Sequence, residues 1–179
     1  MRRRLIGLAM FVVIVLTLTS QFVVRDGHPA LHRQGPRLLW KEEPFTGLIF
    51  RLHPNYRPEF LATYYSGARH GWEISWFVDG TKSRQRAYQG GLYHGVSQTW
   101  HANGRISTWR TYDHGLADGE QWAWGRDGQV LEYNRYQKDQ ELVHRTWTFD
   151  GKPFHNYVFQ NGDKVGVQGE QFCKRIKRY

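Results

Sequence analysis

The sequence contains a single cysteine, Cys173, so no intramolecular disulfide can form. A disulfide-stapled fold and a zinc site built from several cysteines are therefore excluded. Acidic residues are also scarce, because 16 Asp and Glu stand against 25 Lys and Arg and leave a formal net charge of +9. This balance favours anionic partners such as phosphates, lipid headgroups or acidic proteins. The simpler alternative is a basic surface that is only solvated.

Proline is rare as well, with six residues in the chain. Glycine and the aromatic residues are abundant by contrast: 19 Gly, eight Trp, ten Tyr and ten Phe. Many short strands joined by tight turns fit this composition better than long helices do.

Long apolar runs are absent except at the N-terminus, where MRRR precedes a run from Leu5 to Val24. A basic start followed by such a run is typical of a signal peptide or signal-anchor, and 20 residues just reach the length that spans a bilayer. No small-x-small cleavage site is evident, which favours an uncleaved helical anchor at 1–24. The remainder would face the periplasm of the cell envelope, or be secreted if the signal is cleaved. Residues 25–42 carry two prolines without a clear period and are interpreted as a linker.

A repeat begins after this segment. Gly47, Gly71, Gly95 and Gly119 are spaced 24 residues apart. Tryptophans and tyrosines keep the same step, and the last member of each set follows after 23 residues: Trp76, Trp100, Trp124, Trp147; Tyr64, Tyr88, Tyr112, Tyr136, Phe159. A fixed period of this size indicates a repeat architecture in which each unit stacks on the next.

Turn dipeptides divide each unit into two strands. Asp79-Gly80, Asn103-Gly104 and Asp127-Gly128 are the strongest of them, and we expect type I′ turns there. With Asp79-Gly80 as a two-residue loop, Glu73 faces Arg86 and Trp76 faces Ser83. Trp72, Ile74, Trp76 and Val78 then share one face, although a bulge would change this.

The predicted fold is therefore all-β: a single-layer, twisted antiparallel meander of about ten strands. A lone hairpin is marginal in water, so the apolar column of aromatic side chains is expected to continue through the units and pack as their core.

The repeats resemble the MORN repeat in its bacterial variant, the YwqK type. The phrase Tyr-x-x-Gly-x-x-x-Gly, followed by an aromatic strand ending in Asn-Gly or Asp-Gly, occurs as YYSGARHGWEISWFVDG, YQGGLYHGVSQTWHANG and YDHGLADGEQWAWGRDG. EEPFTGLIFRLHPN resembles the family's usual opening, and the last two copies are degenerate. The resemblance covers most of the predicted repeat domain, 43–172, which precedes a basic tail at 173–179.

The resemblance implies little about function. MORN repeats are associated with membrane attachment and protein scaffolding, and bacterial members are frequently labelled antitoxins. We expect a non-enzymatic binding or scaffold protein of the cell envelope that recognises a protein partner or an anionic membrane surface. The alternative is an antitoxin or immunity-type protein of a toxin–antitoxin system, although an export segment fits poorly with neutralising a cytoplasmic toxin.

Signals for chemistry are weak. Acidic residues are scattered singly, no P-loop or G-x-S-x-G phrase occurs, and Cys173 has no base placed beside it. His70, His94 and Asp118 occupy equivalent positions, but alternate strands lie about 9–10 Å apart, too far for one zinc ion to bridge. We therefore expect no catalytic residue, no metal and no cofactor.

The basic residues form the most distinct candidate surface. Lys82, Arg84 and Arg86 alternate along one predicted strand, so we expect them to share a face. Together with the tail KRIKRY they would attract anionic headgroups, or merely discourage edge pairing. A nucleic-acid partner is not expected, because an exported protein rarely meets one. The predicted contacts with an anionic surface are Lys82, Arg84, Arg86, Lys174, Arg175, Lys177 and Arg178.

Overall fold

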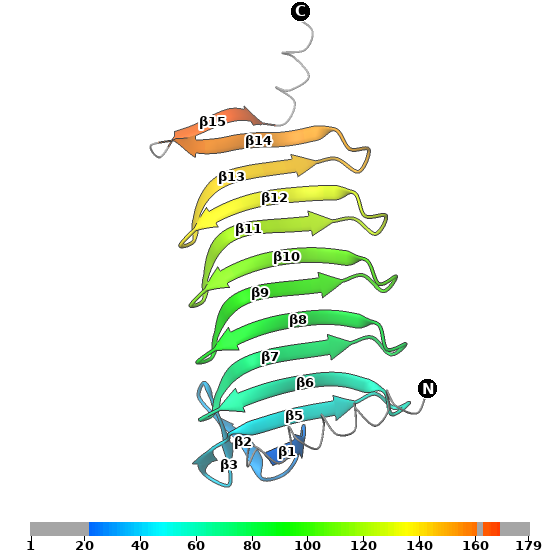
Figure 1. Cartoon of the computed structure of the whole chain (residues 1–179), viewed down its shortest axis with the longest axis vertical. Coiled ribbons are helices and arrows are strands. Elements are labelled where there is room, and N and C mark those ends of the chain that lie inside the picture. Colours follow the sequence, from blue (N-terminus) through cyan, green and yellow to red (C-terminus); the bar gives the residue numbers. More distant parts are fainter. Residues whose placement is uncertain (1–21, 161–162, 169–179) are drawn as a thin grey trace, which may run out of the picture.

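The computed structural model describes residues 22–160 and 163–168 of the chain (Figure 1). The described residues form 15 β-strands and no helix, which confirms the all-β prediction. Within these ranges no helix is long and apolar enough to cross a membrane. The predicted N-terminal helix at 1–24 lies outside the described residues except for its last three, which belong to a strand, β1 (Phe22–Arg25).

One long sheet carries the repeats, and its strands stack in chain order along the long axis of the molecule (Figure 1). Each strand from β5 onward pairs antiparallel with the next, as the hairpin signals predicted, and β1 joins the start of the sheet by pairing parallel with β5. The antiparallel strands are β5 (Gly47–Leu52), β6 (Pro58–Tyr65), β7 (Ala68–Trp76), β8 (Lys82–Gln89), β9 (Leu92–Trp100), β10 (Ile106–Asp113), β11 (Leu116–Trp124), β12 (Val130–Gln137), β13 (Gln140–Trp147), β14 (Pro153–Gln160) and β15 (Asp163–Gln168).

A second, small sheet caps the N-terminal end of the long one. It consists of β2 (Leu31–Gln34), β3 (Arg37–Trp40) and β4 (Glu43–Pro44), and it occupies most of the segment interpreted as a linker. Strands of two to four residues are too short to show a hydrophobic period, which explains why the sequence did not reveal them. The backbone joins the cap to the first repeat, because Leu38 N–H donates to Gly67 O and Gly67 N–H donates to Phe45 O, both at 2.8 Å.

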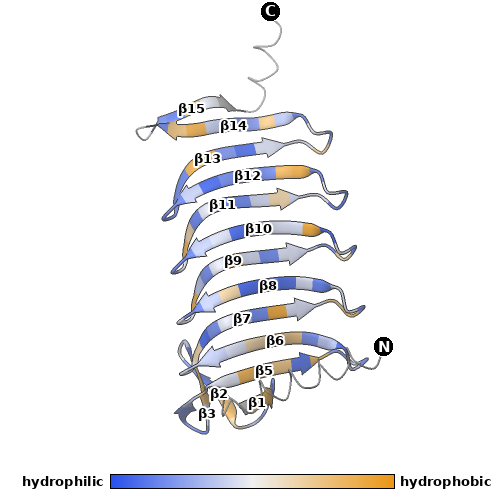
Figure 2. Ribbon diagram, in the orientation of Figure 1, coloured by the Kyte–Doolittle hydropathy of each residue, from blue (hydrophilic) through white to orange (hydrophobic). Residues whose placement is uncertain are grey.

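The buried hydrophobic core lies under this cap. Leu38 of the cap and Phe45, which directly follows the cap, pack with Ile49, Ala62 and Tyr64 of the long sheet. Phe45 is the largest fully buried side chain among the described residues. Figure 2 shows hydrophobic residues along β5 and β6 and a mostly hydrophilic β8. Away from the cap the sheet is a single layer, so its apolar side chains are largely half-buried.

The aromatic columns nevertheless continue beyond the cap, as predicted. The Tyr88 and Tyr93 ring centroids are 4.9 Å apart, and those of Tyr93 and Tyr112 are 5.1 Å apart. Neighbouring strands therefore contact each other through rings as well as through backbone hydrogen bonds.

Turns at the two edges of the long sheet differ in type. At one edge both central residues have positive φ, as a type I′ turn requires, and this edge includes Ser66-Gly67 (48° and 80°) and His114-Gly115 (46° and 89°). In the Asp-Gly and Asn-Gly loops at the other edge only the glycine does, with Gly80 at 93°. There Gly80 N–H donates to Phe77 O at 2.9 Å and Phe77 N–H donates to Thr81 O at 2.8 Å. The prediction of type I′ turns at the Asp-Gly and Asn-Gly pairs is therefore wrong, because a longer loop with one left-handed glycine replaces them.

A register shift accompanies each of these longer loops. Glu73 faces Arg86 as expected, but Trp76 faces Lys82 rather than Ser83. On β8 two residues, from Arg84 to Lys82, match the single step from Ser75 to Trp76 on β7. Neighbouring residues on a strand point to opposite faces, so the bulge turns Lys82 away from the face of Arg84.

Histidine, asparagine and arginine side chains connect the longer loops of successive units. His53 Nε2 lies 3.0 Å from Trp76 O, Asn55 Nδ2 donates to Val78 O at 2.9 Å, and Arg57 donates to Asp79 O. The same three contacts recur 48 residues later, so this edge repeats every two units. The second set consists of His101 with Trp124, Asn103 with Arg126 and Arg105 with Asp127.

Two turn glycines test how tightly the cap fits the first repeat. Gly67 and Gly151 have nearly the same φ, 80° and 78°, but a Cβ at Gly67 would lie 3.0 Å from Leu38 O while one at Gly151 meets nothing within 4 Å. We expect Gly151→Ala to lower the free energy of unfolding by about 1–2 kcal/mol through the left-handed backbone. Gly67→Ala should lose about 1–2 kcal/mol more through the clash with the cap.

Chemical denaturation followed by tryptophan fluorescence measures both variants. Equal losses in the two variants would show that the cap does not press on the turn at Gly67.

Candidate functional site

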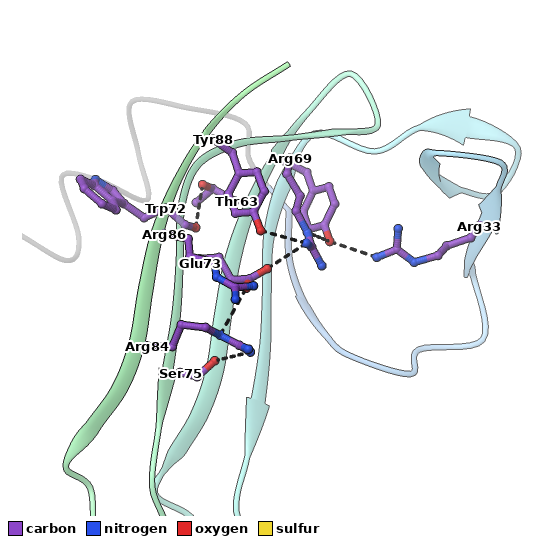
Figure 3. Close-up of polar contacts among 10 residues, drawn as sticks. Arg33, Thr63, Arg69, Trp72, Glu73, Ser75, Arg84, Arg86 and Tyr88 are labelled. Atoms are coloured by element: carbon purple, nitrogen blue, oxygen red, sulfur yellow. Dashed lines mark hydrogen bonds and ion pairs between the residues drawn. The ribbon is translucent and has the colours of Figure 1, made fainter. Parts of the chain in front are cut away.

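A cluster of arginines surrounds one buried carboxylate near the cap (Figure 3). The Glu73 side chain is 3% exposed, and Arg69 Nη1 lies 3.1 Å from its Oε2. Arg84 Nε and Arg86 Nη1 each lie 3.7 Å from its Oε1. We call Glu73, Arg69, Arg84 and Arg86, together with Arg33, the basic cluster. Arg84 and Arg86 are two of the residues that the sequence nominated.

Two tyrosine hydroxyls extend the basic cluster toward the cap. Tyr64 Oη accepts from Arg33 Nη2 at 3.3 Å and from Arg69 Nε at 3.4 Å, and Tyr88 Oη accepts from Arg69 Nη1 at 3.2 Å. The Arg69 guanidinium also lies 5.3 Å from the centre of the Tyr88 ring. Arg33 belongs to β2, so the cluster joins the cap to the first two repeats (Figure 3).

Charge in the basic cluster is unbalanced. The cluster contains four guanidinium groups, those of Arg33, Arg69, Arg84 and Arg86, and one carboxylate, that of Glu73, so its net formal charge is +3. Burial opposes the charged form of Arg69, yet its hydrogen bond to Tyr64 and the charge of Glu73 hold its pKa above the usual value. Arg69 therefore stays charged at any physiological pH.

Arg110 extends the same surface along the sheet. Ser97 on β9 faces Arg86 on one side and Arg110 on the other, so all three side chains share the face of Glu73. Arg110 is exposed. We call the surface formed by Glu73, Arg84, Arg86, Ser97 and Arg110 the basic face.

A cleft lies where the cap meets the first turns of the repeats. Its volume is about 560 Å³, and its lining brings three arginines together without an acidic residue. The lining residues are Arg33, Pro36, Arg37, Tyr65, Ser66, Ala68, Arg69, Gly90 and Gly91. An anionic group entering this cleft would find guanidinium donors on two sides.

Lys82 does not belong to the basic face, although the alternation Lys82, Arg84, Arg86 predicted that it would. The bulge at the start of β8 places it on the opposite face, where Lys82 Nζ lies 5.0 Å from the centre of the Trp100 ring and donates to Gln85 Oε1 at 2.7 Å. The other four nominated residues lie outside the described residues: Lys174, Arg175, Lys177 and Arg178.

The opposite face is aromatic. Trp72 and Trp109 are exposed there, Trp72 pointing away from the basic cluster (Figure 3). Trp122 packs against Tyr133 with ring centroids 4.3 Å apart, beside a shallow, mainly apolar hollow of about 520 Å³ that also involves Arg145. Tryptophans on this face therefore pack between neighbouring strands and also leave ring surface open to solvent.

Sequence reasoning missed Arg33, Tyr64 and Arg69 as members of the basic cluster. One signal was available, because the expected register already placed Glu73 opposite Arg86 and thus an acid beside the nominated arginines. No sequence signal pointed to Arg33, because its contact with Tyr64 spans 31 residues and depends on the cap.

Comparison with known protein families and with curated proteins gives no significant match to the chain. The resemblance to MORN-variant repeats therefore stays a prediction from the sequence motifs.

The negative charge of Glu73 partly neutralises the arginines, so replacing it with a neutral residue should lower the stability of the fold. Glu73→Gln leaves Arg69, Arg84 and Arg86 without their carboxylate, and we expect unfolding to become easier by about 2 kcal/mol. This is less than the roughly 3–5 kcal/mol of a fully buried ion pair, because the arginines are about a third exposed. Urea denaturation measures this change in the free energy of unfolding. The matched control is Glu120→Gln on the opposite face, where the side chain is exposed, and it should leave the stability nearly unchanged. A loss in Glu73→Gln no larger than that of the control would contradict a structural role for the carboxylate.

Ionisation of Tyr88, beside the basic cluster, should lower the stability of the fold at alkaline pH. Burial, a hydrogen bond with Tyr93 and the charge of Glu73 raise the pKa of Tyr88 to about 12, from an ordinary value of 10.0. A raised pKa of an acid means that the folded state holds its proton more tightly than the unfolded state. Its contribution to stability is therefore complete below pH 10 and is lost as the pH rises toward 12. Stability measured across this window should fall less steeply in Tyr88→Phe than in the wild type, whereas the exposed Tyr56→Phe should keep the wild-type slope.

Proposed function

We propose that the chain is a non-enzymatic binding protein of the cell envelope that recognises an acidic protein partner through its basic face. The single observation that supports this proposal is the excess of arginine over carboxylate around Glu73. The cluster uses one carboxylate to hold three guanidinium groups in place and retains a net positive charge.

The geometry suits recognition of carboxylates. Arginine presents a planar fork of N–H donors that matches a carboxylate, and the Glu73 contacts fix three of these forks along two adjacent strands. Fixing the side chains in advance lowers the entropy lost on binding. The exposed Arg110 and the cleft lined by Arg33 and Arg37 extend the positive surface on both sides of the cluster.

Location in the envelope is supported by the predicted export or anchor segment at 1–24. Among the described residues no second layer lies over the repeats beyond the cap, and this broad surface suits a protein partner better than a small molecule. The MORN-variant resemblance also supports a scaffold or binding role. An anionic membrane surface could occupy the basic face instead, so the experiment must distinguish a protein partner from a membrane.

Adjacent residues on β9 provide a matched pair of probes. Ser97 lies on the basic face, between Arg86 and Arg110, whereas Gln98 lies on the opposite face, between Gln85 and Trp109. A photo-crosslinking amino acid placed at Ser97 in cells should give a discrete protein adduct, and one placed at Gln98 should not.

The charge reversal Arg110→Glu should reduce that adduct at least about fivefold, since it replaces attraction by repulsion directly opposite Ser97. Arg135→Glu changes the net charge equally on the opposite face and should leave the adduct unchanged. Equal crosslinking from both positions, or equal loss in both charge variants, would contradict the proposal. Flotation of the protein with anionic but not neutral vesicles, without a protein adduct, would identify the membrane as the occupant instead.

A further inference from the structure

Two histidines and an aspartate meet at the edge of the sheet where β10 turns into β11. His94 Nδ1 lies 3.2 Å from Asp113 Oδ1, and His114 Nδ1 lies 2.7 Å from the same oxygen. The ligand atoms of the three side chains all lie within 4.8 Å of one another. His94 is half-buried, while Asp113 and His114 are exposed.

The way the strands pair brings these residues together. Tyr112 on β10 faces Gly95 on β9, so the next residue, Asp113, comes beside His94. His114 is the first central residue of the type I′ turn and has a φ of 46°. This left-handed backbone, uncommon for a residue other than glycine, holds the His114 ring near that of His94, with centroids 4.7 Å apart.

His94 Nδ1 is in an unusual state. It is shielded from solvent and forms no hydrogen bond within the described part of the chain, although a carboxylate oxygen is 3.2 Å away. A buried polar atom of this kind is normally satisfied by a partner. A cation between the imidazole nitrogens and the carboxylate would supply one.

Only one unit of the repeat has His or Asp at all three of these positions. The positions equivalent to His94, Asp113 and His114 hold His70, Gln89 and Gly90 in the preceding unit. In the following unit they hold Asp118, Gln137 and Lys138. The repeat architecture therefore does not need these three residues together, and their combination is specific to this turn.

We propose that His94, Asp113 and His114 form a binding site for a divalent transition metal ion, with Zn²⁺ as the reference. Two imidazoles and one carboxylate are ligands that Zn²⁺ accepts, and bonds of about 2.0–2.2 Å allow two ligand atoms to lie up to about 4.2 Å apart. The exposed His114 ring reaches this range with a shift below about 1 Å. Three protein ligands leave at least one coordination position to water or to a group from a partner.

This site differs from the pair that the sequence argument rejected. That argument considered equivalent positions in alternate strands, such as His70 and His94, which lie too far apart for one ion. His94 and Asp113 are instead neighbours across adjacent strands, and the turn supplies the third ligand. The basic cluster takes no part in the site, so the metal site and the proposed binding face can fail independently.

Zn²⁺ titration of the untagged full-length chain in detergent, by calorimetry at pH 8, tests the proposal, and Co²⁺ absorption reports the ligand set. The repeat itself provides variants that fit the fold: Asp113→Gln introduces the residue of both neighbouring units, and His114→Gly reproduces the Gly90-Gly91 turn. We expect the wild type to bind one Zn²⁺ at His94, Asp113 and His114. Each variant should lose affinity by more than about tenfold and should change the Co²⁺ spectrum.

Two controls complete the design. His70→Asn removes the equivalent histidine of the preceding unit, and Arg110→Glu disturbs the proposed binding face; neither should alter the affinity of this site. Far-ultraviolet circular dichroism of each variant verifies that the sheet persists. Absence of a Zn²⁺ or Co²⁺ site, or equal affinity in the wild type, Asp113→Gln and His114→Gly, would overturn the proposal.

Discussion

Pairing of each strand with its neighbours in the chain is the interaction on which the rest of the structure depends. Beyond the cap, the described residues form no second sheet or helix that packs against the long sheet to bury a continuous hydrophobic core. The stability of the long sheet comes from backbone hydrogen bonds, ring contacts and turn geometry between neighbours, as in other quasi-one-dimensional folds. The cap is the exception, because β2 to β4 cover the buried hydrophobic cluster found among the described residues and close the N-terminal end of the sheet.

A single layer also explains how a carboxylate becomes buried in an open sheet. In the part of the chain that the structure describes, no other layer covers Glu73, and long side chains from its own strand and from β8 exclude water from it instead. Arg69, Arg84 and Arg86 lie across it, and their charges offset the cost of its desolvation. Burial and excess positive charge therefore arise from the same residues, which makes this region both part of the fold and the best candidate for recognition.

Repetition separates architecture from specific chemistry in this protein. Positions that recur in most units, such as the turn glycines and the tyrosines, serve strand pairing and packing. Features that occur once, such as the cap, the basic cluster and the group formed by His94, Asp113 and His114, are not required by the repeat. The loop contacts of His53 and His101 recur after 48 residues and so belong to the architecture, which shows that a histidine alone carries no functional meaning here.

The sequence by itself determined the repeat period, the all-β class, the order of the hairpins and the pairing of Glu73 with Arg86. These depend on contacts between residues close in the chain, so glycine positions and aromatic spacing are enough to predict them. Only the tertiary structure decided that Lys82 and Arg84 lie on opposite faces, that residues 31–44 form a cap, and that Arg33 reaches Tyr64. A bulge of one residue reverses a side chain without any compositional trace, and the contacts of the cap join distant segments, so neither could be read from local spacing.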